Sequence, residues 1–276
     1  MNDNGEVARY AVVGNPIGHS LSPVIHGHFS RQTGENISYD RIEAPLEGFA
    51  ATVQAFFAQG GRGLNVTVPF KQAAWELVEQ RSSRAESAGA VNTLWCDDEG
   101  RLCGDNTDGI GLVRDLQRNG VALDARRILI LGAGGAVRGI MEPLIEAGPL
   151  EIVIANRTLE KAETLANTFG GRVAVKAMAF GDVVDGFDLI INGTSASLQG
   201  DLPPLADTLV TPETACYDMM YGSGTTVFNQ WAQSRGAACT LDGLGMLVEQ
   251  AAESFRIWRG VLPETEPVIG ALRQSG

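Results

Sequence analysis

Glycines cluster at one junction in the second half of the chain, where residues 129–139 read LILGAGGAVRG. An apolar run that favours a strand precedes them, and a run that favours a helix follows. Glycine at such a junction lets the backbone approach a pyrophosphate, with free N–H groups and the helix dipole aimed at it. The match to G-x-G-x-x-G is imperfect because Val137 occupies the last glycine position, and a plain tight turn is the alternative. We predict a phosphate-binding loop formed by Gly132, Ala133, Gly134, Gly135 and Ala136.

The strand predicted after this loop, residues 151–156, ends in a way that distinguishes between two dinucleotides. Enzymes that prefer NAD carry an Asp or Glu about 20 residues after the loop, where it accepts hydrogen bonds from the ribose hydroxyls. Asn156, Arg157 and Thr158 stand here instead. A guanidinium can hold a 2′-phosphate with two parallel hydrogen bonds, whereas an acid would repel it. The sequence therefore favours NADP over NAD; a surface arginine at a strand end is the alternative.

Predicted strands and helices alternate through both halves of the chain, which indicates parallel sheets covered by helices on both faces. In the first half we predict strands at 7–13, 37–44 and 63–70 and helices at 24–34, 46–60 and 72–80. Residues 91–106 are expected to form a hairpin around positions 97–100. In the second half we predict strands at 126–132, 151–156, 173–178, 187–193 and 215–221 and helices at 136–148 and 161–170.

A chain of 276 residues has room for two domains of ordinary size. We predict a two-domain α/β fold in which residues 1–107 form a substrate-binding domain with a mostly parallel sheet. Residues 108–243 are expected to form a Rossmann-type NADP-binding domain. The apolar helix predicted at 243–261 should return to the first domain, which thereby gains residues 244–276. We expect substrate and cofactor to meet across a cleft between the two domains.

Composition excludes several classes of partner. A formal net charge of −12 disfavours nucleic acid and anionic membranes, because both require a basic patch. No apolar run approaches the length of a membrane span, and the N-terminus lacks the basic and apolar regions of a secretory signal. The four cysteines match no metal or redox spacing, so we expect reduced thiols in a cytoplasmic protein: Cys96, Cys103, Cys216 and Cys239.

Three polar stretches in the first half place hydroxyl and amide side chains where apolar strands end. They are HSLSP at 19–23, NVTVPFK at 65–71 and the segment from VNT to GDNTDG at 91–109. Ligands of open α/β sheets lie beyond the carboxyl ends of the strands, so these stretches are candidate walls of a site. Together with GAGGA, NRT and the late GLGMLVEQ, they make the chain resemble the shikimate dehydrogenase family over essentially its whole length.

The resemblance implies a role for each matching residue. The catalytic pair would be Lys71 and Asp108. Substrate would be bound by Ser20, Ser22, Asn65, Thr67, Lys71, Asn92, Asp108, Tyr221 and Gln250. Besides the loop and the strand end described above, the cofactor would contact Lys161, Thr194, Met219 and Gly243. Ser83 departs from the pattern, because some relatives have a glutamate there that touches the cofactor.

The chemistry of an alcohol dehydrogenation supports a lysine in this place. A nicotinamide takes only the hydride, so the protein must manage the hydroxyl proton. The histidines are confined to His19, His26 and His28, which we expect at the helix surface or in packing; no metal site is expected. Burial would lower the pKa of a lysine and a neighbouring carboxylate would raise it, so we assign proton transfer to Lys71 and Asp108 as one coupled unit.

Several alternatives stay open at this point. Lys71 and Asp108 would form a structural salt bridge if the pair had no catalytic role. Ser20 and Ser22 would cap the helix that begins near Pro23, a role compatible with holding a carboxylate. We expect reversible NADPH-dependent reduction of 3-dehydroshikimate to shikimate by a monomer or homodimer. A quinate or aminoshikimate dehydrogenase of the same family, or a catalytically silent NADPH-binding regulator, is the alternative.

Overall fold

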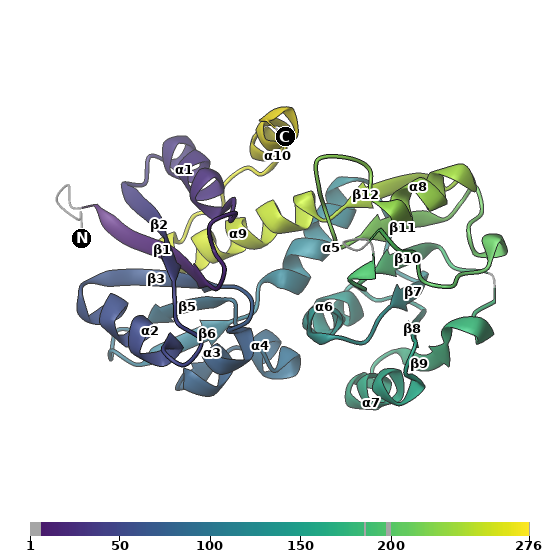
Figure 1. The fold of residues 1–276 in the computed structure, drawn as a ribbon, viewed down its shortest axis with the longest axis horizontal. Coiled ribbons are helices and arrows are strands. Elements are labelled where there is room, and N and C mark those ends of the chain that lie inside the picture. The colour runs from purple at the N-terminus through teal and green to yellow at the C-terminus, as the bar shows by residue number, and fades with distance from the viewer. Residues whose placement is uncertain (1–6, 185, 197–199, 276) are drawn as a thin grey trace. The chain divides into compact units, whose positions relative to one another are not determined.

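The structure is a computed structural model that describes residues 7–184, 186–196 and 200–275 (Figure 1). Residues 1–6, on which the expectation about a secretory signal partly depends, lie outside the described residues. The chain divides into two compact units, residues 1–111 with 248–275 and residues 112–247. It passes from the first to the second within helix α5 (Asp108–Arg118) and returns within α9 (Leu244–Arg259). These crossings lie a few residues after the expected boundaries, so Asp108 belongs to the first unit.

The first unit is built on a six-stranded sheet with the order β2-β1-β3-β5-β6-β4. Strands β1, β2 and β3 run parallel, and β5 and β6 form the predicted antiparallel hairpin next to β3. The strands are β1 (Ala8–Gly14), β2 (Ile37–Glu43), β3 (Gly61–Val66), β4 (Gln80–Arg81), β5 (Thr93–Cys96) and β6 (Leu102–Asp105). The helices of this unit, besides parts of α5 and α9, are α1 (Ser22–Thr33), α2 (Phe49–Ala58), α3 (Lys71–Leu77), α4 (Ser83–Ala88) and α10 (Glu266–Ser275).

The two faces of this sheet differ in chemistry because side chains alternate along a strand. Leu64 and Val66 of β3 pack with the apolar residues of α2, α3 and α4 in one core. Asn65, between them, points to the other face, where α1 and α9 lie (Figure 1). Asn65 thus places a polar side chain on the face opposite to this apolar core.

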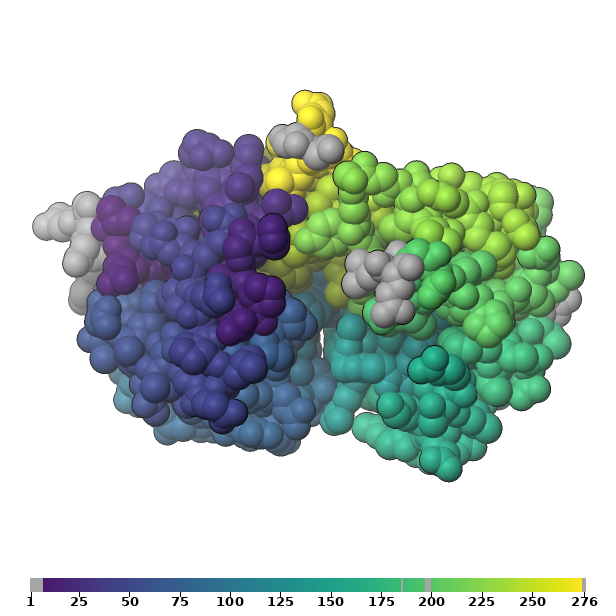
Figure 2. Space-filling model, in the orientation of Figure 1, coloured from purple at the N-terminus to yellow at the C-terminus, as the bar shows by residue number. Residues whose placement is uncertain are grey.

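Hydrogen bonds between Gln32 and Glu264 join the segment that precedes α10 to α1 of the first unit. Gln32 of α1 donates to the Glu264 carbonyl at 3.2 Å and accepts from the Glu264 N–H at 2.8 Å. The yellow atoms in Figure 2 belong to the C-terminal segment and lie at the surface. The prediction that the C-terminal helix returns to the first domain is confirmed, and α10 extends that return.

The second unit contains a six-stranded parallel sheet with the order β12-β11-β10-β7-β8-β9. Reading from β9, this is the 3-2-1-4-5-6 order of the doubly wound dinucleotide fold. Its strands are β7 (Arg127–Leu131), β8 (Glu151–Asn156), β9 (Ala174–Ala179), β10 (Leu189–Asn192), β11 (Ala215–Asp218) and β12 (Cys239–Asp242). Its helices are α6 (Gly135–Glu146), α7 (Leu159–Phe169) and α8 (Val227–Ser234). The predicted Rossmann-type architecture is confirmed.

Helices cover both faces of the second sheet. Ile128 and Ile130 of β7 pack with residues of α5, α6 and α7, whereas Leu129 and Leu131 pack with Phe228 and other residues around α8. These four strand side chains are fully buried. A strand buried on both faces is apolar at every position, which explains why RILIL has no polar alternation.

Candidate active site

Lys71 and Asp108 form the closest charged contact of the predicted site. Lys71 opens α3 and Asp108 opens α5, and Lys71 Nζ lies 2.6 Å from Asp108 Oδ2. The two side chains are 30% and 15% exposed. A partly exposed pair of this kind contributes little to stability, because water and side-chain entropy offset the attraction. The pair is therefore better placed to meet a ligand than to hold the fold together.

Lys71 begins a helix, which corrects the expectation that it follows a strand running through Phe70. Strand β3 ends at Val66, and the residues after it turn, because the Phe70 N–H donates to the Thr67 carbonyl at 3.0 Å. Val68 is 65% exposed, so the apolar alternation that predicted the longer strand does not reflect burial. Pro69 has no N–H to donate to a strand ladder, which accounts for the early end of β3.

Asn92 links this pair to other predicted residues. Asn92 Nδ2 donates to Asp108 Oδ1 at 2.9 Å and to Gln250 Oε1 at 3.3 Å. It also donates to Thr107 Oγ1 at 2.9 Å. Asn92 is 2% exposed, and Gln250 is held on α9 in the same unit. The structure thus brings Lys71, Asp108, Asn92 and Gln250 into one hydrogen-bonded cluster.

Asn65 lies next to this cluster on β3. Its Oδ1 accepts from the Tyr39 hydroxyl at 2.6 Å, and its Nδ2 donates to Ser254 Oγ at 3.0 Å and to the Asn92 carbonyl at 3.2 Å. Burial raises the pKa of Tyr39 well above its ordinary value, so the phenol stays protonated and donates. Thr67 follows β3 and is half-buried, and its N–H donates to the Val13 carbonyl.

The two serines of the S-L-S-P turn contact each other. Ser20 Oγ donates to Ser22 Oγ at 3.2 Å, and the Ser20 carbonyl accepts from the Arg41 guanidinium at 2.6 and 3.0 Å. Ser22 is the first residue of α1, and Leu21 is its N-cap with no side-chain cap. The Ser22 N–H donates to Ser20 Oγ at 3.3 Å, so Ser20 engages the first N–H group of α1, as the capping alternative expected.

His26 packs in the interior of the first unit, whereas His19 is exposed and His28 is half-buried. His26 is fully buried, and its ring stacks on Tyr39 with centroids 4.1 Å apart. Burial lowers the pKa of His26 to about 3, so the ring is neutral near pH 7. Within the described part of the chain, no group of three or more His, Cys, Asp and Glu side chains is arranged to hold a metal ion.

The glycine loop of the second unit joins β7 to α6, as predicted. Gly132 has a φ of 103°, a left-handed conformation that favours glycine. Gly134 is the N-cap residue of α6, and no side-chain hydrogen bond caps this helix end. A Cβ atom on Gly134 or Gly135 would meet no protein atom within 4 Å. The start of α6 is therefore open around Gly134 and Gly135, next to the exposed residue Ala136, with Ala133 half-buried. This cradle fits a pyrophosphate, because nothing in the loop occupies the space that the missing side chains leave.

The residues predicted to read the ribose end lie after β8. Arg157, Thr158 and Lys161 are exposed, and Asn156 Nδ2 donates to the Thr158 carbonyl at 2.9 Å. Thr194 follows β10, and its hydroxyl donates to Asn192 Oδ1 at 2.7 Å. All of these positions follow the carboxyl ends of parallel strands, where this fold binds its ligands.

Met219 and Gly243, the two residues predicted to line the nicotinamide, are neighbours in the second unit. A Cβ on Gly243 would lie 2.1 Å from the Met219 carbonyl oxygen, so only glycine permits this approach. Met219 is 8% exposed. Tyr221 follows in the same loop and is 40% exposed. It belongs to the second unit, whereas the other predicted substrate residues belong to the first.

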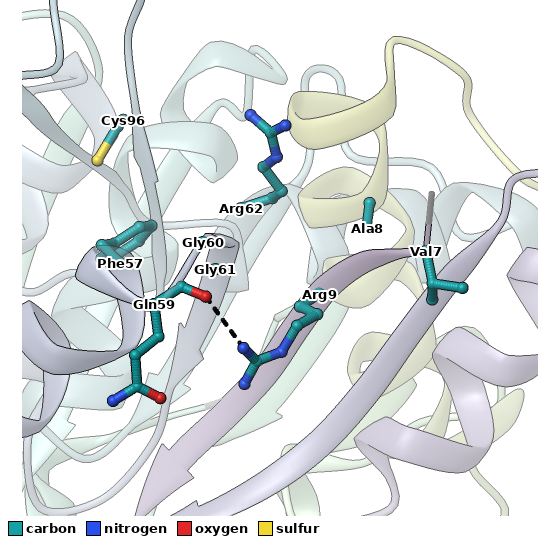
Figure 3. A pocket seen from close by; sticks show the side chains of 9 residues that line it. All are labelled: Val7, Ala8, Arg9, Phe57, Gln59, Gly60, Gly61, Arg62 and Cys96. Carbon is teal, nitrogen blue, oxygen red and sulfur yellow. Dashed lines mark hydrogen bonds between the residues drawn. The ribbon is translucent and has the colours of Figure 1, made fainter. Parts of the chain in front are cut away.

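A cavity of about 390 Å³ lies at the opposite edge of the first sheet, at the amino ends of β1 and β3 (Figure 3). Arg9 lines it and donates to the Gln59 carbonyl at 3.1 Å, while Arg62 points away from this contact. Phe57 and the exposed Cys96 complete the walls. None of the predicted site residues lines this cavity, and its two cations do not converge on one point.

The fold and the site together define the class of enzyme to which the chain belongs. A doubly wound parallel sheet with an open glycine cradle, and a lysine–carboxylate pair among buried amides, are the parts of a dinucleotide-dependent dehydrogenase. Family models match as a shikimate dehydrogenase substrate binding domain at residues 12–94, a shikimate/quinate 5-dehydrogenase at 115–199 and a shikimate 5′-dehydrogenase C-terminal domain at 243–273. The chain belongs to the shikimate dehydrogenase family.

Individual proteins to which the chain is similar include named shikimate dehydrogenases. The NADP(+) shikimate dehydrogenase of Hahella chejuensis is 61% identical over 96% of this chain and 98% of its own. The shikimate 5-dehydrogenase of Thermus thermophilus, solved with NADP(H) and shikimate, is 34% identical with a TM-score of 0.87 over 98% of this chain and 100% of its own. The 5-ketofructose reductase of a Gluconobacter strain is 30% identical, with a TM-score of 0.90 over 99% of this chain and 100% of its own.

Four residues of the hydrogen-bonded cluster were missed at the level of sequence: Tyr39, Thr93, Thr107 and Ser254. Thr93 and Thr107 lie inside the VNT and GDNTDG stretches, so membership of those motifs was a usable signal. Tyr39 lies on an edge strand and Ser254 on α9, and neither stands next to a motif. Only the fold brings these two to Asn65.

Proposed function

We propose that the chain is an NADP-dependent shikimate dehydrogenase that reduces 3-dehydroshikimate to shikimate reversibly, within aromatic amino-acid biosynthesis. The observation that carries the proposal is the 2.6 Å contact between Lys71 Nζ and Asp108 Oδ2, with Asn92 donating to the other carboxylate oxygen. Family membership and the NADP(+) enzymes among the relatives support the reaction and the cofactor.

Lys71 and Asp108 manage the proton of the reacting hydroxyl. In the reducing direction the Lys71 ammonium donates a hydrogen bond to the substrate carbonyl oxygen and stabilises the negative charge that develops there. In the oxidising direction the pair receives the hydroxyl proton as a coupled unit. Asp108 keeps Lys71 Nζ in place, and Asn92 keeps Asp108 in place. When bound, NADPH would supply the hydride in the reducing direction, and NADP+ would accept it in the oxidising direction.

Substrate binding falls to the polar residues around this pair. Ser20 and Ser22 stand at the start of α1, where the helix N-terminus and hydroxyl donors suit the substrate carboxylate. Asn65, Thr67, Asn92 and Gln250 suit the ring hydroxyls, with Tyr221 as a further contact.

Cofactor binding falls to the glycine cradle and the residues after β8. The open space beside Gly134 and Gly135 fits the pyrophosphate, and the exposed Arg157 fits a 2′-phosphate. Asn156, Thr158, Lys161 and Thr194 complete the proposed contacts, and Met219 with Gly243 would line the nicotinamide. An acidic residue is missing from the 2′ position of the strand end, which favours NADP.

A spectrophotometric assay tests the proposal. Purified protein is assayed with shikimate or quinate in the presence of NADP or NAD, and with 5-ketofructose in the presence of NADPH or NADH. The absorbance of the reduced nicotinamide is followed in each case. The proposal expects the highest kcat/KM for shikimate with NADP. Preference for quinate with NAD would support a quinate dehydrogenase, and NADPH binding without turnover of any substrate would support a regulator.

Two finer properties accompany the proposal. We propose a cytoplasmic enzyme that acts as a monomer or homodimer. None of the helices in the described part of the chain is long and apolar enough to cross a membrane. Light scattering of the eluting protein would distinguish monomer from homodimer.

A further inference from the structure

The orientation of the Asn92 amide matters to the site, because its two ends have opposite hydrogen-bonding character. The Nδ2 group donates and Oδ1 accepts. Only one orientation suits Asp108, since a carbonyl oxygen turned toward Asp108 Oδ1 would place acceptor against acceptor. A donor at this place engages one carboxylate oxygen while Lys71 engages the other.

Two neighbours identify which end of the Asn92 amide is the oxygen and which is the nitrogen. The backbone N–H of Thr107 can only donate, and it lies 2.9 Å from Asn92 Oδ1. The Asp108 carboxylate can only accept when ionised, and it lies 2.9 Å from Asn92 Nδ2. The oxygen therefore faces Thr107 N and the nitrogen faces Asp108.

The hydroxyl of Thr93 also donates to Asn92 Oδ1, at 2.8 Å, which is shorter than the 3.2 Å contact that the Thr107 hydroxyl makes with the same oxygen. A hydroxyl can donate or accept, so its direction depends on its other neighbours. Asn65 Nδ2 lies 3.4 Å from Thr93 Oγ1, and Ser254 Oγ lies 2.8 Å from it. Asn65 Nδ2 can only donate to the Thr93 oxygen, whereas the bond between Thr93 and Ser254 can run either way, because the Ser254 hydroxyl also donates to the Gln250 carbonyl at 3.1 Å. Asn92 Oδ1 can only accept, so it is the acceptor to which the Thr93 hydrogen is directed.

We propose that Thr93 is a positioning residue whose hydroxyl locks the Asn92 amide with its N–H group toward Asp108. The inference rests on the proposed function of the Lys71–Asp108 pair. Thr93 is fully buried on β5, directly opposite Asn65 in the β3–β5 ladder, so it touches protein atoms on all sides. It acts on the reaction through Asn92.

The test compares Thr93→Val with Thr93→Ser in the shikimate assay. Valine keeps the branched shape and removes the hydroxyl, and serine keeps the hydroxyl. We expect Thr93→Val to lower kcat about 3- to 10-fold, the effect of one hydrogen bond, with the KM for NADP unchanged. Thr93→Ser should stay within about twofold of wild type. A serine variant as impaired as the valine variant, or a valine variant as active as wild type, would overturn the proposal.

A double variant separates positioning from general disturbance of the core. In an Asn92→Ala background the amide is gone, so adding Thr93→Val should lower kcat no further. An equal loss in both backgrounds would overturn the proposal. Thr214→Val is the matched control, because Thr214 is also fully buried and its hydroxyl donates to the Phe187 carbonyl. It should lower stability and leave kcat unchanged.

Two further measurements apply if the Thr93→Val variant is unstable or if the wild-type protein is inactive. If Thr93→Val is too unstable to assay, Thr93→Cys, whose thiol is a weaker donor, should fall between wild type and Asn92→Ala. A wild-type protein that fails to oxidise shikimate would refute the proposed function. The lock would then be tested by hydrogen exchange of the Asn92 side-chain amide in NMR spectra. Faster exchange in Thr93→Val supports the lock, and an unchanged rate contradicts it.

Discussion

Lys71 Nζ and Asp108 Oδ2 are 2.6 Å apart although the two residues are separated by 37 positions in the chain. Each is the first residue of a helix, α3 or α5, and both belong to the first unit. The Asn92 amide donates to the remaining carboxylate oxygen. A lysine, a carboxylate and an amide from three separate segments thus form one cluster, and the predictions below test what it and the cofactor cradle do.

Arg157→Ala tests whether Arg157 binds the 2′-phosphate of NADP. We expect the KM for NADP to rise about 10- to 100-fold, the worth of one or two charged hydrogen bonds, and the KM for NAD to change less than about twofold. Initial rates with each cofactor give the ratio. Arg126→Ala is the control, because Arg126 is half-exposed and precedes β7, at the amino end of the sheet. Equal effects of Arg157→Ala on both cofactors would show that the arginine does not contact the 2′-phosphate.

Gly134→Ala tests the phosphate cradle. A Cβ at this position meets no protein atom within 4 Å, and the backbone there is extended, so stability should change by no more than about 1 kcal/mol. A pyrophosphate held against the loop would collide with the methyl group, so the KM for NADP should rise at least about 10-fold. Gly270→Ala, on α10, adds a methyl group into open space and should change neither quantity. An unchanged KM in Gly134→Ala would remove the loop from the cofactor site.

His26 predicts a specific pH dependence of stability. Its pKa is lowered to about 3 in the folded protein, from 6.5 in the unfolded chain, because burial disfavours the charged ring. Below pH 6.5 the unfolded state binds a proton that the folded state does not, so the free energy of unfolding decreases as the pH falls toward 3. Between about pH 7 and pH 5 this group alone should remove roughly 2 kcal/mol.

Urea denaturation of His26→Phe at these two pH values checks the prediction. Phenylalanine keeps an aromatic ring against Tyr39 and cannot titrate, so the variant should lose less stability on acidification than wild type. His19→Gln, at an exposed position, should behave as wild type. The prediction is wrong if the His26→Phe variant and wild type lose stability in parallel.

Strands and helices with a regular apolar pattern could be predicted from the sequence. Elements that depend on tertiary packing to overcome a low intrinsic propensity could not. The apolar run of β7 and the glycines after it indicate a buried strand and a phosphate loop. Helix α5 was missed because Gly109 and Gly111 each lower helix propensity by about 1 kcal/mol relative to alanine. Leu112 and Leu116 overcome that cost, because both are fully buried in the core of the second unit.

The site could be predicted where its residues lie in short motifs. NVTVPFK and GDNTDG identified Lys71 and Asp108 as a pair through the family resemblance, whereas the 2.6 Å contact between them is a property of the fold. The direction of an amide is likewise a property of its neighbours, so the orientation of Asn92 depends on Thr107 N–H and on Asp108. Ser254 reaches Asn65 because α9 returns to the first unit, a contact between residues 189 positions apart.

The rate of shikimate oxidation by Lys71→Ala tests the central claim most directly. The variant removes the group that manages the hydroxyl proton and leaves Asn65, Asn92 and the serines to bind the substrate. We predict that kcat with shikimate and NADP falls by at least about 100-fold while the KM for shikimate changes only a few-fold, as expected for a group that acts mainly in the transition state. A variant that oxidises shikimate at the wild-type rate would contradict the assignment of proton transfer to Lys71 and Asp108.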